Sequence, residues 1–252
     1  MDNKTALITG ATSGIGKATA QLFAENGINL VLCGRRKERL ETLQNELSEK
    51  VKVHIASFDV RNKTEVFNAI EAIPSAFKKI DILINNAGNA HGLSPIDKGA
   101  IDDWDAMIDG NVKGLLYVSK AIIPGMVERK SGHIINIGST AGKEVYPGGN
   151  VYCASKHAVD AINQGMRIDL HAHGIRVGAV NPGLVETEFS QVRLKGDTEK
   201  AGAVYEGFTP LSPQDVAEII HFTVTRPPHV NIADLIVMPT DQASSTIVNK
   251  NA

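Results

Sequence analysis

The segment Thr5-Ala6-Leu7-Ile8-Thr9-Gly10-Ala11-Thr12-Ser13-Gly14-Ile15-Gly16 joins a short apolar run to the start of a helical pattern. Glycines here permit a tight turn, let the backbone approach a pyrophosphate, and let helix and strand pack closely. The helix N-terminus then presents free N–H groups and a positive dipole end to the anion. The spacing of Gly10, Gly14 and Gly16 is not the commoner G-x-G-x-x-G, so a purely structural turn is the alternative. The position of the turn between a first strand and a first helix favours a dinucleotide site.

Beyond this turn, short β-branched runs alternate with longer helical patterns. We expect strands at Ala6–Thr9, Asn29–Cys33, Val51–Ser57, Ile80–Asn85, His133–Gly138, Ile175–Asn181 and Ile232–Met238. We expect helices at Gly16–Glu25, Arg36–Leu47, Lys63–Ala72, Asp102–Arg129, Tyr152–His173 and Pro213–Val224. Because the strands are nearly all apolar and alternate with helices, they should form a parallel, doubly wound sheet covered on both faces. No linker rich in Pro, Gly or Ser divides the chain, so we expect a single α/β domain over residues 1–252.

The composition is ordinary for a globular protein, with 42% apolar and 21% charged residues. A net charge of −2 gives no reason to expect nucleic acid or an anionic membrane as a partner. No run approaches the roughly 18 apolar residues of a spanning helix, and we interpret the N-terminal apolar run as a strand rather than a signal peptide. Cys33, Cys153 and the histidines show neither a disulfide framework nor metal-ligand spacing. We therefore expect no metal and a cytoplasmic location.

The second expected strand ends without the acidic residue that binds the ribose hydroxyls in NAD sites. It runs into Gly34-Arg35-Arg36-Lys37, so three cations open the next helix. Cations at a helix N-terminus oppose the macrodipole by tenths of a kcal/mol each, which suggests that an anion sits there. We expect this anion to be the 2′-phosphate of NADP, since guanidinium groups such as Arg35 and Arg36 bind phosphate oxygens in a bidentate fork. A solvated helix face is the alternative.

A second group of residues carries the chemistry of proton transfer. Tyr152 and Lys156 are four residues apart at the start of a helical pattern, so they share a face. A phenol has a pKa of about 10. An ammonium beside it, together with the positive nicotinamide ring, favours the phenolate, which could take the proton of an alcohol while hydride leaves. Ser139 follows an apolar strand and could hold the substrate oxygen. Taken singly, each of these residues also has a plain structural explanation.

Together these motifs resemble the short-chain dehydrogenase/reductase family along nearly the whole chain. Besides the glycine turn and the Ser, Tyr and Lys residues, the matching motifs are Phe58-Asp59-Val60, Asn85-Asn86-Ala87-Gly88, Asp109-Gly110-Asn111-Val112-Lys113-Gly114 and Asn181-Pro182-Gly183. The resemblance implies a Rossmann fold with seven parallel strands in the order 3-2-1-4-5-6-7. It also implies an enzyme that interconverts an alcohol and its carbonyl compound.

The resemblance assigns roles to individual residues. Tyr152 would be the general acid/base and Ser139 would orient the substrate. Lys156 would lower the pKa of Tyr152 and hold the nicotinamide ribose, while Asn111 would maintain a water-linked proton path. The residues implied in cofactor binding are Gly10, Thr12, Ser13, Gly14, Ile15, Gly16, Arg35, Arg36, Asp59, Val60, Asn86, Ala87, Gly88, Tyr152, Lys156, Pro182, Gly183, Val185 and Thr187. No catalytic position is substituted, which leaves a non-catalytic NADP-binding sensor as the remote alternative.

The region after the last motif bears on the substrate. The stretch from Pro182 to Ser190 resembles the branch of NADP-dependent 3-hydroxy acid dehydrogenases, which includes serine and allo-threonine dehydrogenases. We expect residues Glu186–Phe208 to cover the substrate as a lid. Arg193 is our candidate for the substrate carboxylate, because its fork suits a carboxylate better than Lys195 does. A generalist carbonyl or 3-oxoacyl-thioester reductase, which would ignore a free carboxylate, is the nearer alternative.

The helix expected over Tyr152–His173 is apolar on more than one face. The residues that exceed one stripe are Ala154, Ala158, Ala161, Ile162, Gly165 and Met166. Burial on both sides could come from the sheet on the inside and a second subunit on the outside. The resemblance implies a homotetramer with two-fold axes, or else a dimer. A helix tucked under the lid is the alternative.

Overall fold

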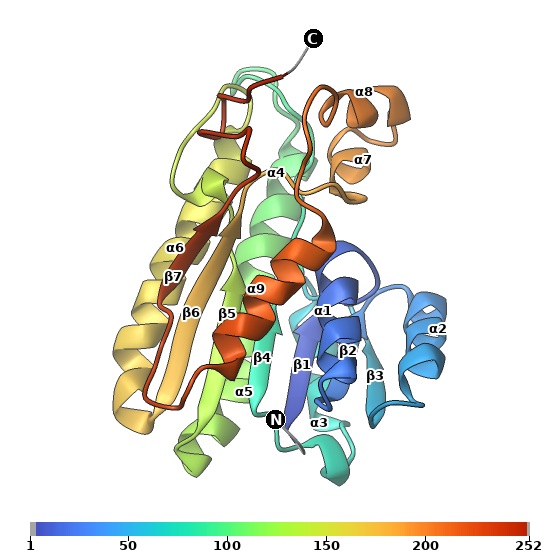
Figure 1. Ribbon diagram of the computed structural model, residues 1–252, viewed down its shortest axis with the longest axis vertical. Helices are drawn as coiled ribbons and strands as arrows, with labels where there is room; N and C mark the ends of the chain where they lie inside the picture. The colour runs from blue at the N-terminus through green and yellow to red at the C-terminus, as the bar shows by residue number, and fades with distance from the viewer. Residues whose placement is uncertain (1–3, 251–252) are drawn as a thin grey trace.

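The computed structural model describes residues 4–250, which form a seven-stranded sheet in the order β3-β2-β1-β4-β5-β6-β7 (Figure 1). Every neighbouring pair of strands is parallel. The direction of winding reverses between β1 and β4, which makes the carboxyl ends of these two strands the switch point of the sheet. The predicted fold class and strand order are confirmed.

The boundaries agree closely with the sequence pattern. The strands are β1 Thr5–Thr9, β2 Asn29–Gly34, β3 Val53–Ser57, β4 Ile82–Asn85, β5 Gly132–Ile137, β6 Ile175–Pro182 and β7 Asp234–Val237. The α-helices are α1 Gly14–Glu25, α2 Lys37–Leu47, α3 Lys63–Glu71, α4 Ile101–Ile108, α5 Gly114–Arg129, α6 Asn150–Leu170, α7 Phe189–Arg193, α8 Thr198–Ala203 and α9 Pro213–Thr225. Most predicted ends lie within two residues of these, because period-2 and period-3.6 apolar patterns end where burial ends.

Two apolar layers sandwich the sheet. On one face α1, α2 and α9 pack against the strands, and on the other α3, α5 and α6 do so. Successive residues of β1 point to opposite faces, so Ile8 joins the first layer and Leu7 the second. This two-sided burial explains why the strands are apolar at nearly every position.

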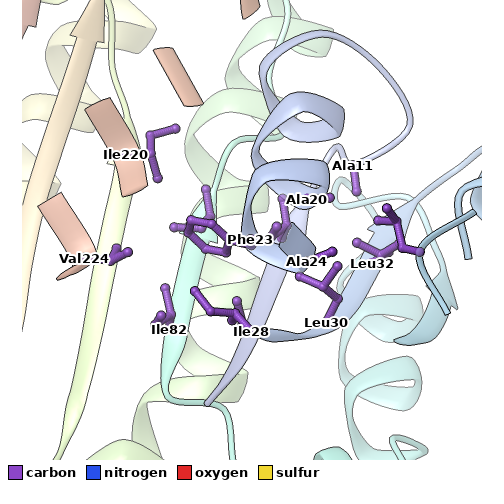
Figure 2. Packing of buried hydrophobic residues seen from close by; sticks show 14 of the residues in the cluster. Ala11, Ala20, Phe23, Ala24, Ile28, Leu30, Leu32, Ile82, Ile220 and Val224 are labelled. Carbon is purple, nitrogen blue, oxygen red and sulfur yellow. The ribbon is translucent and has the colours of Figure 1, made fainter. Parts of the chain in front are cut away.

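Phe23 anchors α1 in the first layer. Its side chain is fully buried, and Figure 2 shows it among side chains of α1, α9 and the neighbouring strands, with Ile220 and Val224 of α9 on one side. Truncating a buried Phe to Ala typically costs about 3–5 kcal/mol. The helix that begins at the glycine turn is therefore held rigidly, and the turn with it.

The structure interrupts the helix that we predicted over Asp102–Arg129. One π-helical turn at Asp109–Lys113 separates α4 from α5. A π turn inserts one extra residue and is frequent at functional sites. The apolar periodicity continues through it, so the sequence did not reveal the interruption.

The segment Glu186–Phe208 contains the two short helices α7 and α8, which lie beyond the carboxyl ends of the strands (Figure 1). A parallel bridge between Val185 and Leu211 brings the two ends of this segment together. Between residues 4 and 250, the structure contains no helix that is long and apolar enough to cross a membrane.

Candidate active site

The glycine turn between β1 and α1 has the conformation that its sequence predicts. Gly10 and Gly14 have φ values of +65° and +50°, in the left-handed region that favours glycine. A Cβ on Gly16 would collide with the carbonyl oxygen of Gly10, so a larger residue would push α1 away from β1. Ser13 caps α1 without a side-chain hydrogen bond, and no acidic residue lies in the first turn. The N–H groups of this helix end can therefore bind an anion.

Arg36 reaches from the end of β2 across to the glycine turn. Its Nη2 donates to Thr12 Oγ1 and to Ser13 Oγ, both at 2.8 Å. Its Nη1 donates to Glu188 Oε2, also at 2.8 Å. Arg35 turns outward and its side chain is 57% exposed. The two arginines are thus adjacent in sequence but differ in surroundings.

Asp59 and Val60 follow β3 at the same edge of the sheet. Asp59 accepts a hydrogen bond from Arg61 Nη2 at 2.7 Å, and Arg35 Nη1 lies 3.5 Å from it. Burial raises the pKa of Asp59, but the hydrogen bonds and charge of Arg61 outweigh this and hold the pKa below its usual value. Val60 packs against Gly114, the first residue of α5. Asp59 is therefore ionised and can accept hydrogen bonds at the carboxyl edge of the sheet.

The segment Asn86-Ala87-Gly88 follows β4, the partner of β1. Asn86 Nδ2 donates to the carbonyl of Thr9 at 2.9 Å and to that of Gly10 at 3.3 Å. The Ala87 N–H donates to Thr9 Oγ1 at 2.9 Å. These bonds fasten the end of β4 to the glycine turn across the switch point. Ile15 lies on the far side of the turn and packs against the first core layer.

Ser139 and Tyr152 lie together although they follow different elements. Ser139 comes after β5 and caps a short 3₁₀ turn, accepting a hydrogen bond from the Ala141 N–H at 3.1 Å. Tyr152 is in the first turn of α6, is only 8% exposed, and lies close enough to Ser139 for the serine side chain to act on its pKa. The structure therefore brings the predicted orienting hydroxyl to the predicted acid/base group.

Lys156 and Asn111 complete this cluster. Lys156 is buried one turn after Tyr152, and its Nζ donates to the carbonyl of Ile137 at 2.9 Å. The Asn111 amide exchanges two hydrogen bonds of 2.8 Å with the backbone of Asn89. A Cβ on Gly88 would lie 3.0 Å from Asn111 Oδ1 and 3.7 Å from Lys156 Nζ, so glycine leaves space beside both groups.

Asn111 lies in the π turn, and its side chain is hydrogen-bonded to the start of α6. Asn111 Nδ2 also donates to Ser155 Oγ at 3.0 Å, and Ser155 Oγ donates to the carbonyl of Tyr152 at 2.7 Å. All of these groups are buried, so each bond is made away from water. This network fixes the first turn of α6, and the sequence analysis did not single out Ser155.

Burial dominates the electrostatics of the two ionisable groups. The pKa of Tyr152 is raised above its usual value because the phenol is buried and lies near Tyr146, while the Ser139 side chain and the charge of Arg193 counteract this in part. Burial lowers the pKa of Lys156 to about 8. The chain's own groups therefore do not produce the lowered phenol pKa that we expected from Lys156, because desolvation outweighs the nearby charges.

The turn after β6 is fixed by the C-terminal region. The Gly183 N–H donates to the carbonyl of Val237 at 2.8 Å, and the Leu184 N–H donates to Gln242 Oε1 at 2.8 Å. Gln242 is buried, and a Cβ on Gly183 would collide with it. Pro182 ends β6 immediately before this turn. The predicted nicotinamide-side turn is thus rigid and lies at the carboxyl end of the sheet.

Val185 and Thr187 carry the chain from this turn into the lid segment. The Val185 carbonyl accepts a hydrogen bond from the Tyr205 hydroxyl at 2.9 Å. Thr187 Oγ1 accepts one from the Phe189 N–H at 3.1 Å. A Cβ on Gly14 would lie 3.2 Å from Thr187 Cγ2, so this segment passes directly over the glycine turn.

Arg193 projects from α7 towards Tyr152. The central carbon of its guanidinium lies 5.3 Å from the ring centroid of Tyr146 and 5.5 Å from that of Tyr152. Its Nη2 is buried and has no hydrogen-bond partner among residues 4–250. The Phe189 ring lies 5.6 Å from the Tyr152 ring, and the Gly92 N–H donates to the Arg193 carbonyl at 2.9 Å. The segment therefore lies closed against the phenol.

Lys195, the other cation considered for the substrate, turns away. Its ammonium pairs with Asp103 on α4 at 2.8 Å and is 61% exposed. A small cavity of about 20 Å³ lies between α4 and Tyr152, with Trp104 and Met107 in its wall. Arg193 rather than Lys195 thus faces the predicted acid/base residue Tyr152.

Several residues that shape the site carry no sequence signal. They are Ser155, Glu188, Tyr146, Tyr205 and Gln242. Each acts through a contact with a distant segment, including Ser155 and Glu188, which lie inside stretches used in the sequence analysis.

A parallel sheet with a glycine turn at its switch point, next to a buried Tyr with Ser and Lys neighbours, defines a dehydrogenase of the nucleotide-binding class. The family model described as short chain dehydrogenase matches residues 4–197. The chain belongs to this family and is an oxidoreductase.

Relatives within the family resemble the chain over nearly its whole length. The NADP-dependent 3-hydroxy acid dehydrogenase YdfG of Salmonella typhi is 49% identical over 94% of this chain and 95% of the relative. Sulfoacetaldehyde reductase 2 of Chromohalobacter salexigens is 48% identical over 95% of each chain. Among solved structures, the closed form of a serine dehydrogenase complexed with NADP+ superposes with a TM-score of 0.93 at 44% identity, covering 98% of this chain and all of that one.

Proposed function

We propose that this chain is an NADP-dependent enzyme that interconverts a small 3-hydroxy acid, such as serine, allo-threonine or 3-hydroxypropionate, and its carbonyl compound. The names of the 3-hydroxy acid and serine dehydrogenase relatives support this proposal. One observation within the chain carries it: the buried, unpartnered Nη2 of Arg193 beside the ring of Tyr152. A cation in that position can bind a carboxylate while the neighbouring phenol exchanges a proton.

The residues of the site fit NADP. The open first turn of α1 suits a pyrophosphate, and the guanidinium of Arg36 beside Thr12 and Ser13 suits a 2′-phosphate. The other groups that we assign to cofactor binding are Arg35, Asp59, the segment at 86–88, Lys156, Pro182, Gly183, Val185 and Thr187. The cofactor, when bound, supplies or accepts the hydride at the substrate carbon.

Within the proposed reaction, the chain's own residues handle the proton. Tyr152 donates its phenolic proton to the carbonyl oxygen in reduction and receives it back in oxidation. Ser139 donates a hydrogen bond to the same oxygen and stabilises developing charge there. We assign Lys156 to favouring the phenolate through its positive charge and to holding the nicotinamide ribose, while burial still dominates the pKa of the phenol in the chain alone. We assign Asn111 to a water-linked proton path that starts at this cluster.

The second relative refines the substrate class. Sulfoacetaldehyde, named in that relative, carries a sulfonate close to its carbonyl group. A guanidinium binds a sulfonate or a carboxylate through the same N–H groups. Arg193 therefore supports a small anionic carbonyl compound as substrate, and the 3-hydroxy acids are the members of this class that we favour.

The experiment is a panel of serine, allo-threonine, 3-hydroxyisobutyrate, 3-hydroxypropionate and neutral alcohols, each with oxidised NADP and NAD, together with a 3-oxoacyl thioester assayed with NADPH and NADH as hydride donors. We expect kcat/KM for 3-hydroxy acids with NADP to exceed that for neutral alcohols by about tenfold or more, since a charge-assisted hydrogen bond contributes about 1.5–3 kcal/mol. Preference for the thioester would instead support a generalist or acyl-thioester reductase. Absence of turnover on every substrate would support the non-catalytic sensor.

We also propose a homotetramer, a single domain with residues 186–208 as its lid, and a cytoplasmic location. The outer face of α6 supports association, because Ile168 is 69% exposed and a Cβ on Gly165 would meet no neighbouring atom. Such a face of small and apolar residues can pack against the same face of a second copy. The buried free thiols of Cys33 and Cys153 fit a reducing compartment.

A further inference from the structure

Glu188, the residue just before α7, is held by two cations from the α2 region. Its Oε2 accepts from Arg36 Nη1 at 2.8 Å, and its Oε1 accepts from Arg39 Nη1 at 2.7 Å. The hydrogen bond with Arg36 is the largest cause that lowers the pKa of Glu188 below its usual value, and Arg39 adds to it against the effect of burial. Glu188 is therefore a carboxylate, and it brings a negative charge to this cluster of cations.

The cluster is the one that suits a 2′-phosphate. Arg36 makes its remaining contacts through Nε and Nη2, which donate to Thr12 Oγ1 and Ser13 Oγ at the glycine turn. A carboxylate and a phosphate accept hydrogen bonds from the same guanidinium N–H groups. Two anions at one guanidinium also repel each other. The carboxylate of Glu188 thus occupies donors that a phosphate needs.

We propose that Glu188 competes with the 2′-phosphate of NADP for Arg36 and Arg39, and so sets how strongly the enzyme distinguishes NADP from NAD. This inference rests on the proposed use of NADP. Dinucleotide-binding folds place the acidic group that governs this choice at the end of the second strand. Here that strand ends in Gly34 followed by two arginines, and the carboxylate comes instead from the lid segment.

The replacement Glu188→Gln tests the competition, because glutamine keeps the shape and removes the charge. Both ion pairs are partly exposed, and such pairs contribute up to about 1 kcal/mol each. We expect Glu188→Gln to tighten binding of adenosine 2′,5′-bisphosphate and NADP about three- to tenfold. Binding of 5′-AMP and NAD should change less than about twofold, since neither carries the 2′-phosphate. Titration calorimetry of the full-length protein measures all four dissociation constants.

Glu186→Gln is the matched control, since Glu186 is an exposed carboxylate two residues earlier and gives the same change in net charge. Equally tighter binding by the control would overturn the inference, because the loss of any nearby negative charge would then explain the result. Unchanged or weaker binding of the bisphosphate by Glu188→Gln would overturn it as well. A thermal melt of each variant establishes that both are folded.

The wild-type titrations separate this inference from the cofactor proposal. If the wild-type protein binds adenosine 2′,5′-bisphosphate no better than 5′-AMP, the proposed NADP preference fails and the inference fails with it. If the preference is present and Glu188→Gln leaves the affinities unaltered, only the role of Glu188 is wrong.

Discussion

The phenol of Tyr152 is covered by two side chains from one short helix. The Arg193 guanidinium lies 5.5 Å from its ring centroid, and the Phe189 ring lies 5.6 Å from it on the same segment. Such a cover excludes water and places one cation beside the phenol. The proposed anionic substrate requires that Arg193 binds an anion rather than serving only as a packing residue.

Replacing Arg193 by Leu separates these two roles. We expect KM for 3-hydroxy acids to rise about 10- to 100-fold, because a charge-assisted hydrogen bond is lost, while neutral alcohols change less than about threefold. Steady-state kinetics on both substrate types measure the difference. Lys195→Met, which removes a cation that pairs with Asp103, is the control and should leave both KM values nearly unchanged. Intact turnover of 3-hydroxy acids by Arg193→Leu would show that the assignment is wrong.

The grouping of the candidate catalytic residues could be predicted from the sequence, but their environment could not. The spacing of Tyr152 and Lys156 fixes a shared helix face. The direction of the Tyr152 pKa shift depends on how deeply the fold buries the phenol, and no local pattern reports that depth. The ion pair between Arg36 and Glu188 joins residues 152 positions apart, which is equally invisible to motif analysis.

At the scale of elements, strand β5 contains a buried histidine, His133, whose protonation in acid would place a charge inside the fold. His133 is 2% exposed, and neither ring nitrogen has a hydrogen-bond partner in the described part of the chain. Burial, and then the charges of Arg176 and Lys4, lower its pKa to about 3. A strand at the centre of the sheet therefore carries an imidazole that must stay neutral for the fold to persist.

We expect His133→Met to make the protein more resistant to acid. The folded pKa of His133 lies below the unfolded value of about 6.5, so its favourable contribution is complete above pH 6.5 and is lost as the pH falls towards 3. The free energy of unfolding of the wild type should fall by up to about 1.4 kcal/mol per pH unit relative to the variant between pH 6 and pH 4. Urea titrations over this range measure it. Parallel pH profiles for the wild type and His133→Met would contradict the prediction, and His229→Met at an exposed position is the matched control.

The elements themselves were largely predictable. Alternating apolar strands and amphipathic helices gave the boundaries of β1 to β7 and the major helices because burial follows sequence period. The π turn at Asp109–Lys113 was missed, since shifting one backbone hydrogen bond leaves the apolar pattern almost unchanged. Helices α7 and α8 were missed because short helices depend on contacts with the rest of the fold.

At the scale of the whole molecule, parallel topology assembles the site. Every strand of the sheet ends at the same edge, so segments after β1, β2, β3, β4, β5 and β6 meet there although they span most of the chain. This is why ordered motifs sufficed to predict which residues gather at the site. The closure of α7 over Tyr152 depends on packing between distant segments, and only the structure reveals it.

The central claim is that the Tyr152 hydroxyl exchanges the proton of the reaction, and Tyr152→Phe tests it most directly. The replacement keeps the ring against Phe189 and removes one oxygen, so the fold and the other residues assigned to NADP stay in place. We predict that kcat with the best substrate of the panel falls about 10²- to 10⁴-fold, the usual worth of general acid–base catalysis. An unchanged kcat in a folded, NADP-binding variant would contradict the account.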